Sequence, residues 1–299
     1  MYRSVFLAAS ALVLVSCGAS DDTDMNDPSA LTPPNGQIGV DTPPAKPAVP
    51  AESADMEEGR ALDADTIDSG EAAEITVTLP SNISELDDGL ASRIRELAYE
   101  GTDEFVANAE NEQEAARNDE FPFRQHSLEV TWQQVGPKTG RLFSYLGTSW
   151  FYTGGAHGNF GFDILNWDEN RRSEIGFANI FADEAAAIDV LKTELRAGLL
   201  KAKKDRLGET DLPDDQLTEW IDPALTDDVA DYGNFTFAQS NVSGAVGGLT
   251  FYYPPYAVGS YAEGDYRVTI PATRLKSIIA PEYANLFEGD PVDANPPGE

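Results

Sequence analysis

"RLFSYLGTSWFYTGGAHGNFGFDIL", residues 141–165, contains two apolar segments around a glycine-rich centre. The first segment, 141–152, is apolar on both faces, which is typical of an inner strand of a sheet. Residues 160–165 predict a second strand. The glycines between them indicate a backbone turn that joins the two strands. The hydroxyl, amide and imidazole groups of this turn make it the first place to look for a functional site.

Strand patterns also lie on both sides of this stretch. Residues 74–80 and 126–135 alternate apolar and polar side chains, and three further strands are expected at 234–239, 249–254 and 265–271. Residues 166–174 are typical of a hairpin connection. The strands outnumber the helices, and many neighbouring strands are expected to be antiparallel.

Two longer helices are expected among these strands. The first is expected at residues 183–207, where four apolar side chains fall on one face of the helix: Ile188, Leu191, Leu195 and Leu199. Asp183 is the expected N-terminal cap, and Gly208 is expected to end the helix. The basic residues of the last turn suit the helix dipole. An earlier stripe runs through Leu86, Leu90, Ile94 and Leu97, with Ser84 as the expected cap and Gly101 as an interruption. Shorter helical segments are expected around 217–221 and 273–279.

The fold class that follows is α+β, with mostly antiparallel sheets and a few packed helices. We expect two small subdomains, an N-terminal one at 75–152 and a C-terminal one at 153–282, followed by a flexible acidic tail at 283–299.

The N-terminus has the pattern of a bacterial lipoprotein signal. Arg3 precedes an apolar run at 5–15, which has the size of a signal-peptide core and ends in Leu-Val-Ser-Cys. We expect a signal peptide at 1–16 and lipidation of Cys17, the only cysteine, so the chain can form no internal disulfide. Lipid would anchor the protein in the cell envelope, at the outer membrane facing the periplasm if the host is Gram-negative.

Residues 17–74 are rich in Asp, Glu, Ala and Pro and are expected to form a disordered acidic tether. The whole chain has a formal net charge of −32. Such a charge repels nucleic acid and attracts basic partners, although acidity can also serve solubility alone.

The usual patterns of catalytic sites are missing. The two histidines, His126 and His157, stand outside an H-E-x-x-H motif; a site that adds Asp163 would be possible but has no recognisable spacing. Residues 241–244 do not form a nucleophile elbow, and the glycine stretch lacks the lysine of a phosphate-binding loop. We therefore expect no catalytic residues, no metal and no cofactor.

Tyrosines are dense near the end of the chain. The segment 250–266 places several of them around Pro254, Pro255 and two glycines. Part of the set belongs to a strand, and the rest lies on a constrained loop of the kind that binding surfaces favour. An equally weighted interpretation is that these loop tyrosines only stabilise the fold and bind no partner.

Three stretches together resemble one family. "YTGGAHGNFGFDIL" (152–165), "FANIFADEAAAIDVL" (177–191) and "LTFYYPPYAVGSYAEGDYRVTIPATRL" (249–275) follow one another as in the RsiV-like extracellular domain, the lysozyme-receptor domain that also accompanies peptidoglycan deacetylases of the PdaC type. The chain departs from those proteins because it lacks a T-F-D-D-G-P-like deacetylase motif and the membrane architecture of an anti-sigma factor.

The resemblance implies a non-catalytic envelope module that binds a cationic lysozyme-like protein or peptidoglycan, as inhibitor or sensor. The partner-binding candidates are the loop residues Pro255, Tyr256 and Tyr261, with Tyr152, Gly154, Gly155, His157 and Asn159 beside them. The alternatives are a structural lipoprotein attached to peptidoglycan and a cryptic peptidoglycan-modifying hydrolase that uses His157. Because partners for catalysis are not visible, we expect His157 to hold the glycine turn through hydrogen bonds.

Overall fold

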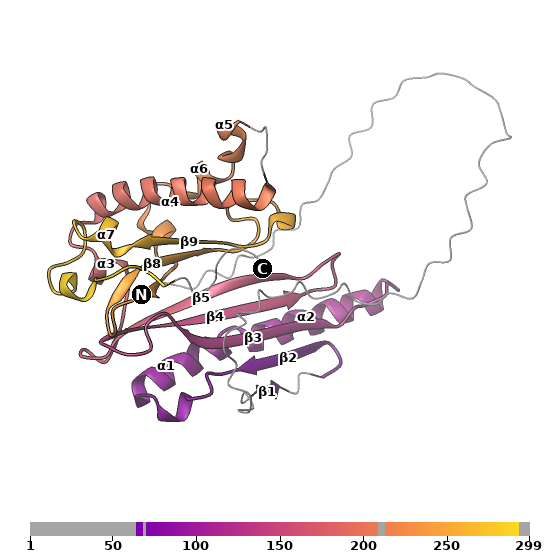
Figure 1. Ribbon diagram of the computed structural model, residues 1–299. Coiled ribbons are helices and arrows are strands. Elements are labelled where there is room, and N and C mark those ends of the chain that lie inside the picture. The colour runs from indigo at the N-terminus through magenta and orange to yellow at the C-terminus, as the bar shows by residue number, and fades with distance from the viewer. Residues whose placement is uncertain (1–63, 68–69, 209–212, 293–299) are drawn as a thin grey trace, which may run out of the picture. The chain divides into compact units, whose positions relative to one another are not determined.

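The computed structural model describes residues 64–67, 70–208 and 213–292 (Figure 1). All of them belong to a single unit of the chain, Pro44–Glu299. The expected signal peptide, Cys17 and the part of the expected tether up to residue 63 lie outside the described residues. The fold class is α+β, as the sequence predicted, and the described residues contain two sheets with a few helices.

The first sheet has six strands that follow one another in chain order. Only β2 and β3 pair in parallel, and the other neighbours are antiparallel. The strands are β1 (Ala64–Ile67), β2 (Ala73–Thr78), β3 (His126–Val135), β4 (Leu142–Tyr152), β5 (Asn159–Asp168) and β6 (Ser173–Ile175). A parallel pair needs a long crossover connection, and this one contains α1 (Asp88–Tyr99) and α2 (Thr102–Asn118).

The two crossover helices cover one face of the first sheet. Leu90 and Ile94 of α1 are buried against Val130 and Trp132 of β3. Gly101 separates α1 from α2, as predicted, because it adopts φ +76°, which glycine tolerates without strain.

The expected cap of α1 was wrong. Asp87 caps this helix, and its carboxylate accepts a hydrogen bond from Gly89 N at 3.0 Å. Ser84 lies one turn earlier, in the short 3-10 helix η1 (Ile83–Glu85). An aspartate and a serine are similarly suited to this position, so the sequence alone did not distinguish them.

The second sheet consists of β7 (Phe235–Gln239), β8 (Val246–Tyr253) and β9 (Tyr266–Pro271), all antiparallel. The helix α4 (Glu184–Leu207) packs on it and confirms its prediction: the carboxylate of Asp183 caps the helix by accepting from Ala186 N at 2.8 Å. The four predicted stripe residues are all buried. The remaining helices are short: α3 (Phe177–Ile180), α5 (Asp214–Leu217), α6 (Ile221–Ala224) and α7 (Ala272–Leu275).

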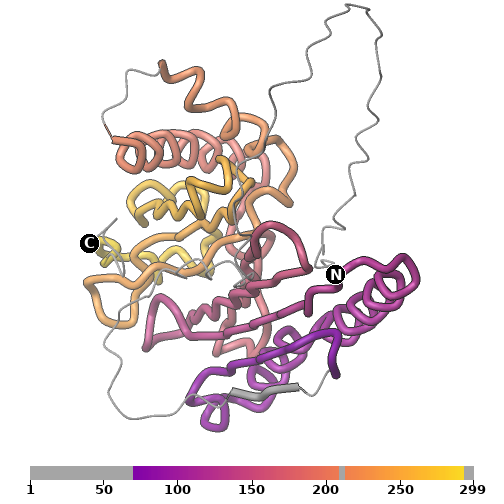
Figure 2. Tube along the Cα trace, turned by 90° about the vertical axis from the view of Figure 1, so that its right-hand side faces the viewer, coloured from indigo at the N-terminus to yellow at the C-terminus, as the bar shows by residue number. Residues whose placement is uncertain are grey.

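Figures 1 and 2 both show α4 on one side of the second sheet and the first sheet on the other. A buried polar network joins the two sheets. The hydroxyl of Ser144 donates to Asn166 Oδ1 at 2.5 Å and accepts from Phe237 N at 2.8 Å, and the Asn166 amide donates to Phe235 O at 2.8 Å. Because buried polar groups cost free energy unless they are paired, this network fixes how β7 lies against β4 and β5.

The expected boundary at residues 152 and 153 does not separate two subdomains. β4 and β5, on either side of it, pair along their length from Phe151↔Asn159 to Leu142↔Asp168. The glycine stretch therefore connects two strands of one sheet, and that sheet continues to β6. The expected tether also ends earlier than residue 74, because β1 pairs with β2.

Residues 283–292, expected as part of a flexible tail, pack against the fold. Tyr283 and Phe287 are buried, and Phe287 forms an isolated bridge with Val246. The Tyr283 hydroxyl donates to the buried Asp168 at 3.1 Å, and Asp168 also accepts two hydrogen bonds from Arg141 at 2.8 and 2.6 Å. Burial raises the pKa of Asp168, but these hydrogen bonds outweigh it and lower the pKa below its usual range. The sequence signal for this packing was the presence of two large side chains, Tyr283 and Phe287, in an acidic, proline-containing segment.

Candidate functional site

The turn between β4 and β5 is held by side chains from outside it. The Arg124 guanidinium lies 3.3 Å from the Tyr152 hydroxyl and 3.5 and 3.4 Å from the carbonyl oxygens of Gly154 and Gly155. The Tyr152 hydroxyl in turn donates to Gly155 O at 3.1 Å. Tyr152 is buried, so this candidate supports the turn from beneath and offers little surface to a partner.

His157 is exposed at the tip of the turn and contacts two neighbours. Its Nδ1 lies 2.9 Å from Gly158 O, where only a protonated ring nitrogen can donate to the carbonyl. Its ring stacks on Tyr261, with centroids 3.9 Å apart and an interplanar angle of 22°. The hydrogen bond agrees with the expected role of His157 in holding the turn. The stack adds a contact that sequence reasoning did not identify.

Gly158 is the point at which the glycine turn and the tyrosine loop meet. Its carbonyl oxygen accepts a hydrogen bond from the Tyr261 hydroxyl at 2.9 Å. A Cβ at this position would lie 2.5 Å from the ring of Trp150, so a larger residue would displace either the indole or the turn. Asn159 follows, and its side-chain oxygen is occupied locally by Phe160 N at 3.0 Å.

The tyrosine loop, residues 254–261, presents one exposed aromatic side chain. Tyr256 is 47% exposed, whereas Pro255 before it is buried. Tyr256 has φ +71°, a left-handed conformation that is rare for a bulky residue. Its ring centroid lies 5.7 Å from that of Tyr261, which links it to His157. The structure thus brings Tyr256, Tyr261 and His157 together as one aromatic surface.

A buried ion pair anchors the base of the tyrosine loop to α4. Glu263 closes the 3-10 turn η3 (Tyr261–Glu263) by accepting from Ser260 N at 2.8 Å. Its other carboxylate oxygen accepts from Lys203 Nζ at 2.6 Å and from the Tyr266 hydroxyl at 2.7 Å. Burial raises the pKa of Glu263, but the hydrogen bonds from Lys203, Tyr266 and Ser260 outweigh it and lower the pKa to about 2.

Lys203 therefore does not play the role expected from its place in the basic C-terminal turn of α4. It is 4% exposed and paired, so it fixes the loop to the helix and does not serve the helix dipole alone. Arg206, one turn later, reinforces the same contact: its guanidinium lies 4.1 Å from the centre of the Tyr266 ring and donates to Asp265 O at 2.5 Å.

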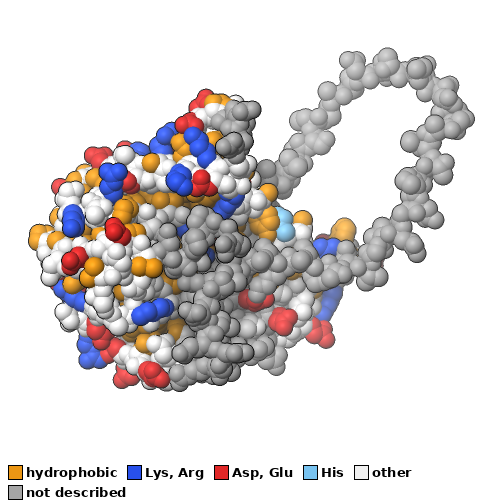
Figure 3. All heavy atoms as spheres, in the orientation of Figure 1, with side chains coloured by type: hydrophobic (Ala, Val, Ile, Leu, Met, Phe, Trp, Pro, Cys, Tyr) orange, Lys and Arg blue, Asp and Glu red, His pale blue; other side chains and the backbone are white. Residues whose placement is uncertain are grey.

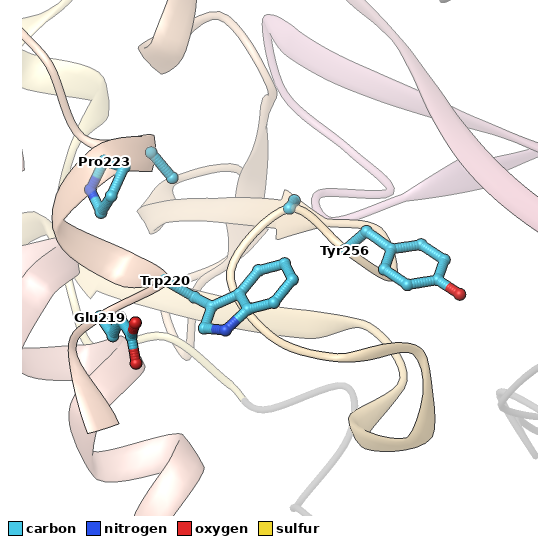
Figure 4. Close-up of a pocket in the computed structure, with 6 residues that line it drawn as sticks. Glu219, Trp220, Pro223 and Tyr256 are labelled. Carbon is cyan, nitrogen blue, oxygen red and sulfur yellow. The ribbon is translucent and has the colours of Figure 1, made fainter. Parts of the chain in front are cut away.

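A shallow groove adjoins the aromatic surface. It is lined by two aromatic side chains, one carboxylate and small apolar groups: Glu219, Trp220, Pro223, Ala224, Tyr256 and Ala257. In Figure 4 the six-membered ring of Trp220 points toward the loop that carries Tyr256, whose hydroxyl points away from Trp220. Trp220 and Glu219 were not among the residues predicted from the sequence. The available signal was a tryptophan in a polar segment, where its 44% exposure is unusual for so large a side chain.

A second hollow lies beside α2 and the start of β3. Its lining includes Glu112, Phe123, Arg124 and His126. His126 is buried, and its Nε2 lies 3.2 Å from a carboxylate oxygen of Glu112. Burial lowers the pKa of His126, while Glu112 acts in the opposite direction. This histidine is thus placed by packing, between the rings of Phe105 and Phe123.

Among residues 64–67, 70–208 and 213–292, no group of three or more His, Cys, Asp or Glu side chains is placed to hold a metal ion. Within the described part of the chain, none of the helices has the length and apolar character needed to cross a membrane.

Comparisons with known proteins give two family matches. Residues 68–160 match the family model described as "Deacetylase PdaC", and residues 178–273 match the one described as "Protein of unknown function (DUF3298)". The first range ends just after the glycine turn, and the second contains α4, the tyrosine loop and the second sheet. No curated protein matches the chain.

One solved structure supports the fold. A DUF3298 family member from Bacteroides fragilis is similar at 20% identity and a TM-score of 0.51, covering 74% of this chain and 94% of that one. A DUF3298 family protein from Pseudomonas aeruginosa has 18% identity and a TM-score of 0.41, with coverage of 77% and 98%. Residues 68–160 are therefore similar to the PdaC family model and residues 178–273 to the DUF3298 family model, and each match covers less than half of the chain.

Proposed function

We propose that this protein is a non-catalytic lipoprotein of the cell envelope whose folded part binds a cationic, lysozyme-like protein, as inhibitor or sensor. The observation that carries the proposal is the aromatic surface formed by Tyr256, Tyr261 and His157. Its members come from two loops that are far apart in the chain, yet they are joined by a ring stack and a hydrogen bond. The resemblance to the RsiV-like domain supports the same surface.

The aromatic surface has the properties of a binding hot spot. Tyr256 exposes a large apolar ring on a loop that is braced by prolines and by the Lys203–Glu263 pair. A tyrosine in such a setting loses little conformational entropy when a partner covers it, and tyrosine is enriched among residues that dominate binding energy. Figure 3 shows hydrophobic side chains beside pale-blue histidine atoms on the face in view.

Charge supports a cationic partner. The net charge of −32 would attract a basic protein over long range and accelerate its association. Salt screens such attraction over distances of about 8–10 Å at physiological ionic strength. Binding that depends on this charge should therefore weaken steadily as salt is raised.

The experiment is a binding titration of the full-length chain, in detergent micelles, against a C-type lysozyme over a salt series. We expect binding at low salt that weakens as salt rises and that is lost in Tyr256→Ala. Phe121→Ala is the matched control, because Phe121 is 72% exposed but lies outside the aromatic surface. Absence of binding at the lowest salt would refute the lysozyme proposal.

A second candidate function is attachment to peptidoglycan. The observation that favours it is the match of residues 68–160 to a family model described as a deacetylase, PdaC. Sedimentation of the protein with purified sacculi tests it, and loss of sedimentation in Tyr256→Ala would assign the contact to the same surface. Sacculi that leave the protein in the supernatant would refute it.

A further inference from the structure

The groove beside the aromatic surface contains a carboxylate without a cation. Glu219 is exposed at its rim and forms no ion pair with the described residues. Three of its acidic neighbours are paired: Asp214 with Lys204 at 2.5 Å, Asp222 with Arg196 at 2.6 Å, and Asp227 with Lys192 at 2.8 Å. The carboxylate of Asp215 accepts from Gln216 N at 3.1 Å and does not line the groove. Glu219 is therefore the acid that lines the groove, and its charge is available to a ligand there.

Both aromatic walls of the groove are held in place. Trp220 stands between two buried anchors, Leu217 and Ile221, and Ile221 N donates to Thr218 O at 3.0 Å. On the opposite wall Ala257 N donates to Pro254 O at 3.1 Å, which fixes the turn that carries Tyr256. The backbone of both walls is thus fixed before a ligand arrives, which reduces the ordering entropy that opposes binding.

We infer that this groove seats an arginine side chain of the protein partner. The guanidinium stacks on the face of Trp220, and its N–H groups donate to the Glu219 carboxylate. This rests on the proposed function, because Tyr256 forms one wall of the groove and belongs to the binding surface.

The chemistry of the groove selects arginine over other occupants. Tryptophan is the aromatic side chain that attracts cations most strongly. A guanidinium is planar, so it can stack and donate two parallel hydrogen bonds to a carboxylate, whereas a lysine ammonium cannot do both. A glycan needs several polar partners for its hydroxyls, and Glu219 is the only charged residue in the lining.

The test uses the full-length chain in detergent micelles and hexa-arginine as the probe. Of the four tryptophans, Trp132 and Trp167 are buried and Trp150 is partly buried, so Trp220 reports on the groove through its fluorescence. Trp220→Phe keeps a stacking face and removes this signal, which assigns it. Glu219→Gln keeps the shape of the side chain and removes its charge.

We expect hexa-arginine to change Trp220 fluorescence, hexa-lysine to bind more weakly, and both Glu219→Gln and Trp220→Ala to reduce hexa-arginine affinity by about three- to tenfold. The inference is overturned if hexa-arginine leaves the fluorescence unchanged or binds Glu219→Gln as tightly as the unchanged protein. It is also overturned if peptidoglycan fragments change the fluorescence equally in Glu219→Gln, because the occupant is then a glycan.

A lysozyme arm separates this inference from the proposed function. If lysozyme binds the unchanged protein and binds Glu219→Gln and Trp220→Ala equally well, the inferred arginine site in the groove is wrong and the proposed function stands. If lysozyme does not bind but hexa-arginine does, and Glu219→Gln lowers the affinity for hexa-arginine, the proposed function is wrong and the inferred arginine site in the groove stands. If both hold, lysozyme whose arginines are blocked with phenylglyoxal binds more weakly.

Discussion

Replacing Glu263 by glutamine tests whether the buried ion pair holds the tyrosine loop in place. The substitution keeps the size of the side chain and leaves Lys203, 4% exposed, without its anionic partner. Breaking a buried pair from one side costs about 3–5 kcal/mol. Because Glu263 is still 15% exposed and the glutamine oxygen can accept from Tyr266, we expect about 2–3 kcal/mol less free energy of unfolding at neutral pH.

The pH dependence gives the same prediction an independent signature. The pKa of Glu263 is lowered from its usual 4.5 to about 2 in the folded state. A lowered pKa means that the unfolded chain binds the proton first, so the stabilisation is fully present above pH 4.5 and is lost as pH falls toward 2. The difference in stability between the unchanged protein and Glu263→Gln should therefore shrink over this range.

Denaturant unfolding followed by circular dichroism, repeated from pH 7 to pH 3, measures both effects. Asp205→Asn is the matched control, because it breaks the exposed pair of Asp205 with Lys201 on the same helix. Exposed pairs of this kind contribute about 0.5 kcal/mol or less. Equal losses in the two variants, or a pH-independent loss in Glu263→Gln, would refute the argument that burial of the Lys203 pair stabilises the loop.

Three further predictions concern other contacts. Asp168→Ala should lower the free energy of unfolding by about 2–3 kcal/mol, because it removes the buried acceptor of Arg141 and Tyr283, although Arg141 keeps its pair with Glu282; unchanged thermal unfolding would contradict this. Gly158→Ala should cost about 1–3 kcal/mol, since the added Cβ meets the Trp150 ring, and it should also weaken lysozyme binding. A Gly158→Ala protein as stable as the unchanged one would show that the indole moves freely. Tyr256→Ala should change stability by about 0.5 kcal/mol or less, because the ring is exposed, yet weaken lysozyme binding at least about tenfold; equal losses of stability and binding would make its role structural.

Local patterns made the elements predictable. The period of α4 and its Asp183 cap indicated the longest helix, and strict alternation marked β3 and β9, because one face of each element is buried. The cap of α1 was missed because Ser84 and Asp87 lie three residues apart and suit the position equally. These predictions depended only on neighbours in the chain.

Contacts between residues far apart in the chain could not be predicted from these local patterns. Tyr261 bonds to Gly158 across 103 positions, and Lys203 bonds to Glu263 across 60. Lys203 resembles any basic residue in the last turn of a helix, and only the folded chain places its ammonium in the interior. The glycine turn was identified as a turn, but its place within one sheet depends on strand pairing that single strands do not encode.

The contact between His157 and Tyr261 also limits how this protein can be divided. His157 lies within the segment that matches the PdaC family model, and Tyr261 lies within the segment that matches DUF3298. A chimaera that takes one segment from a relative without an aromatic residue at the matching position would lose the contact between His157 and Tyr261, against which the exposed Tyr256 packs. Grafting this surface onto another scaffold, or tracing its inheritance among relatives, therefore requires both segments to be followed as one unit.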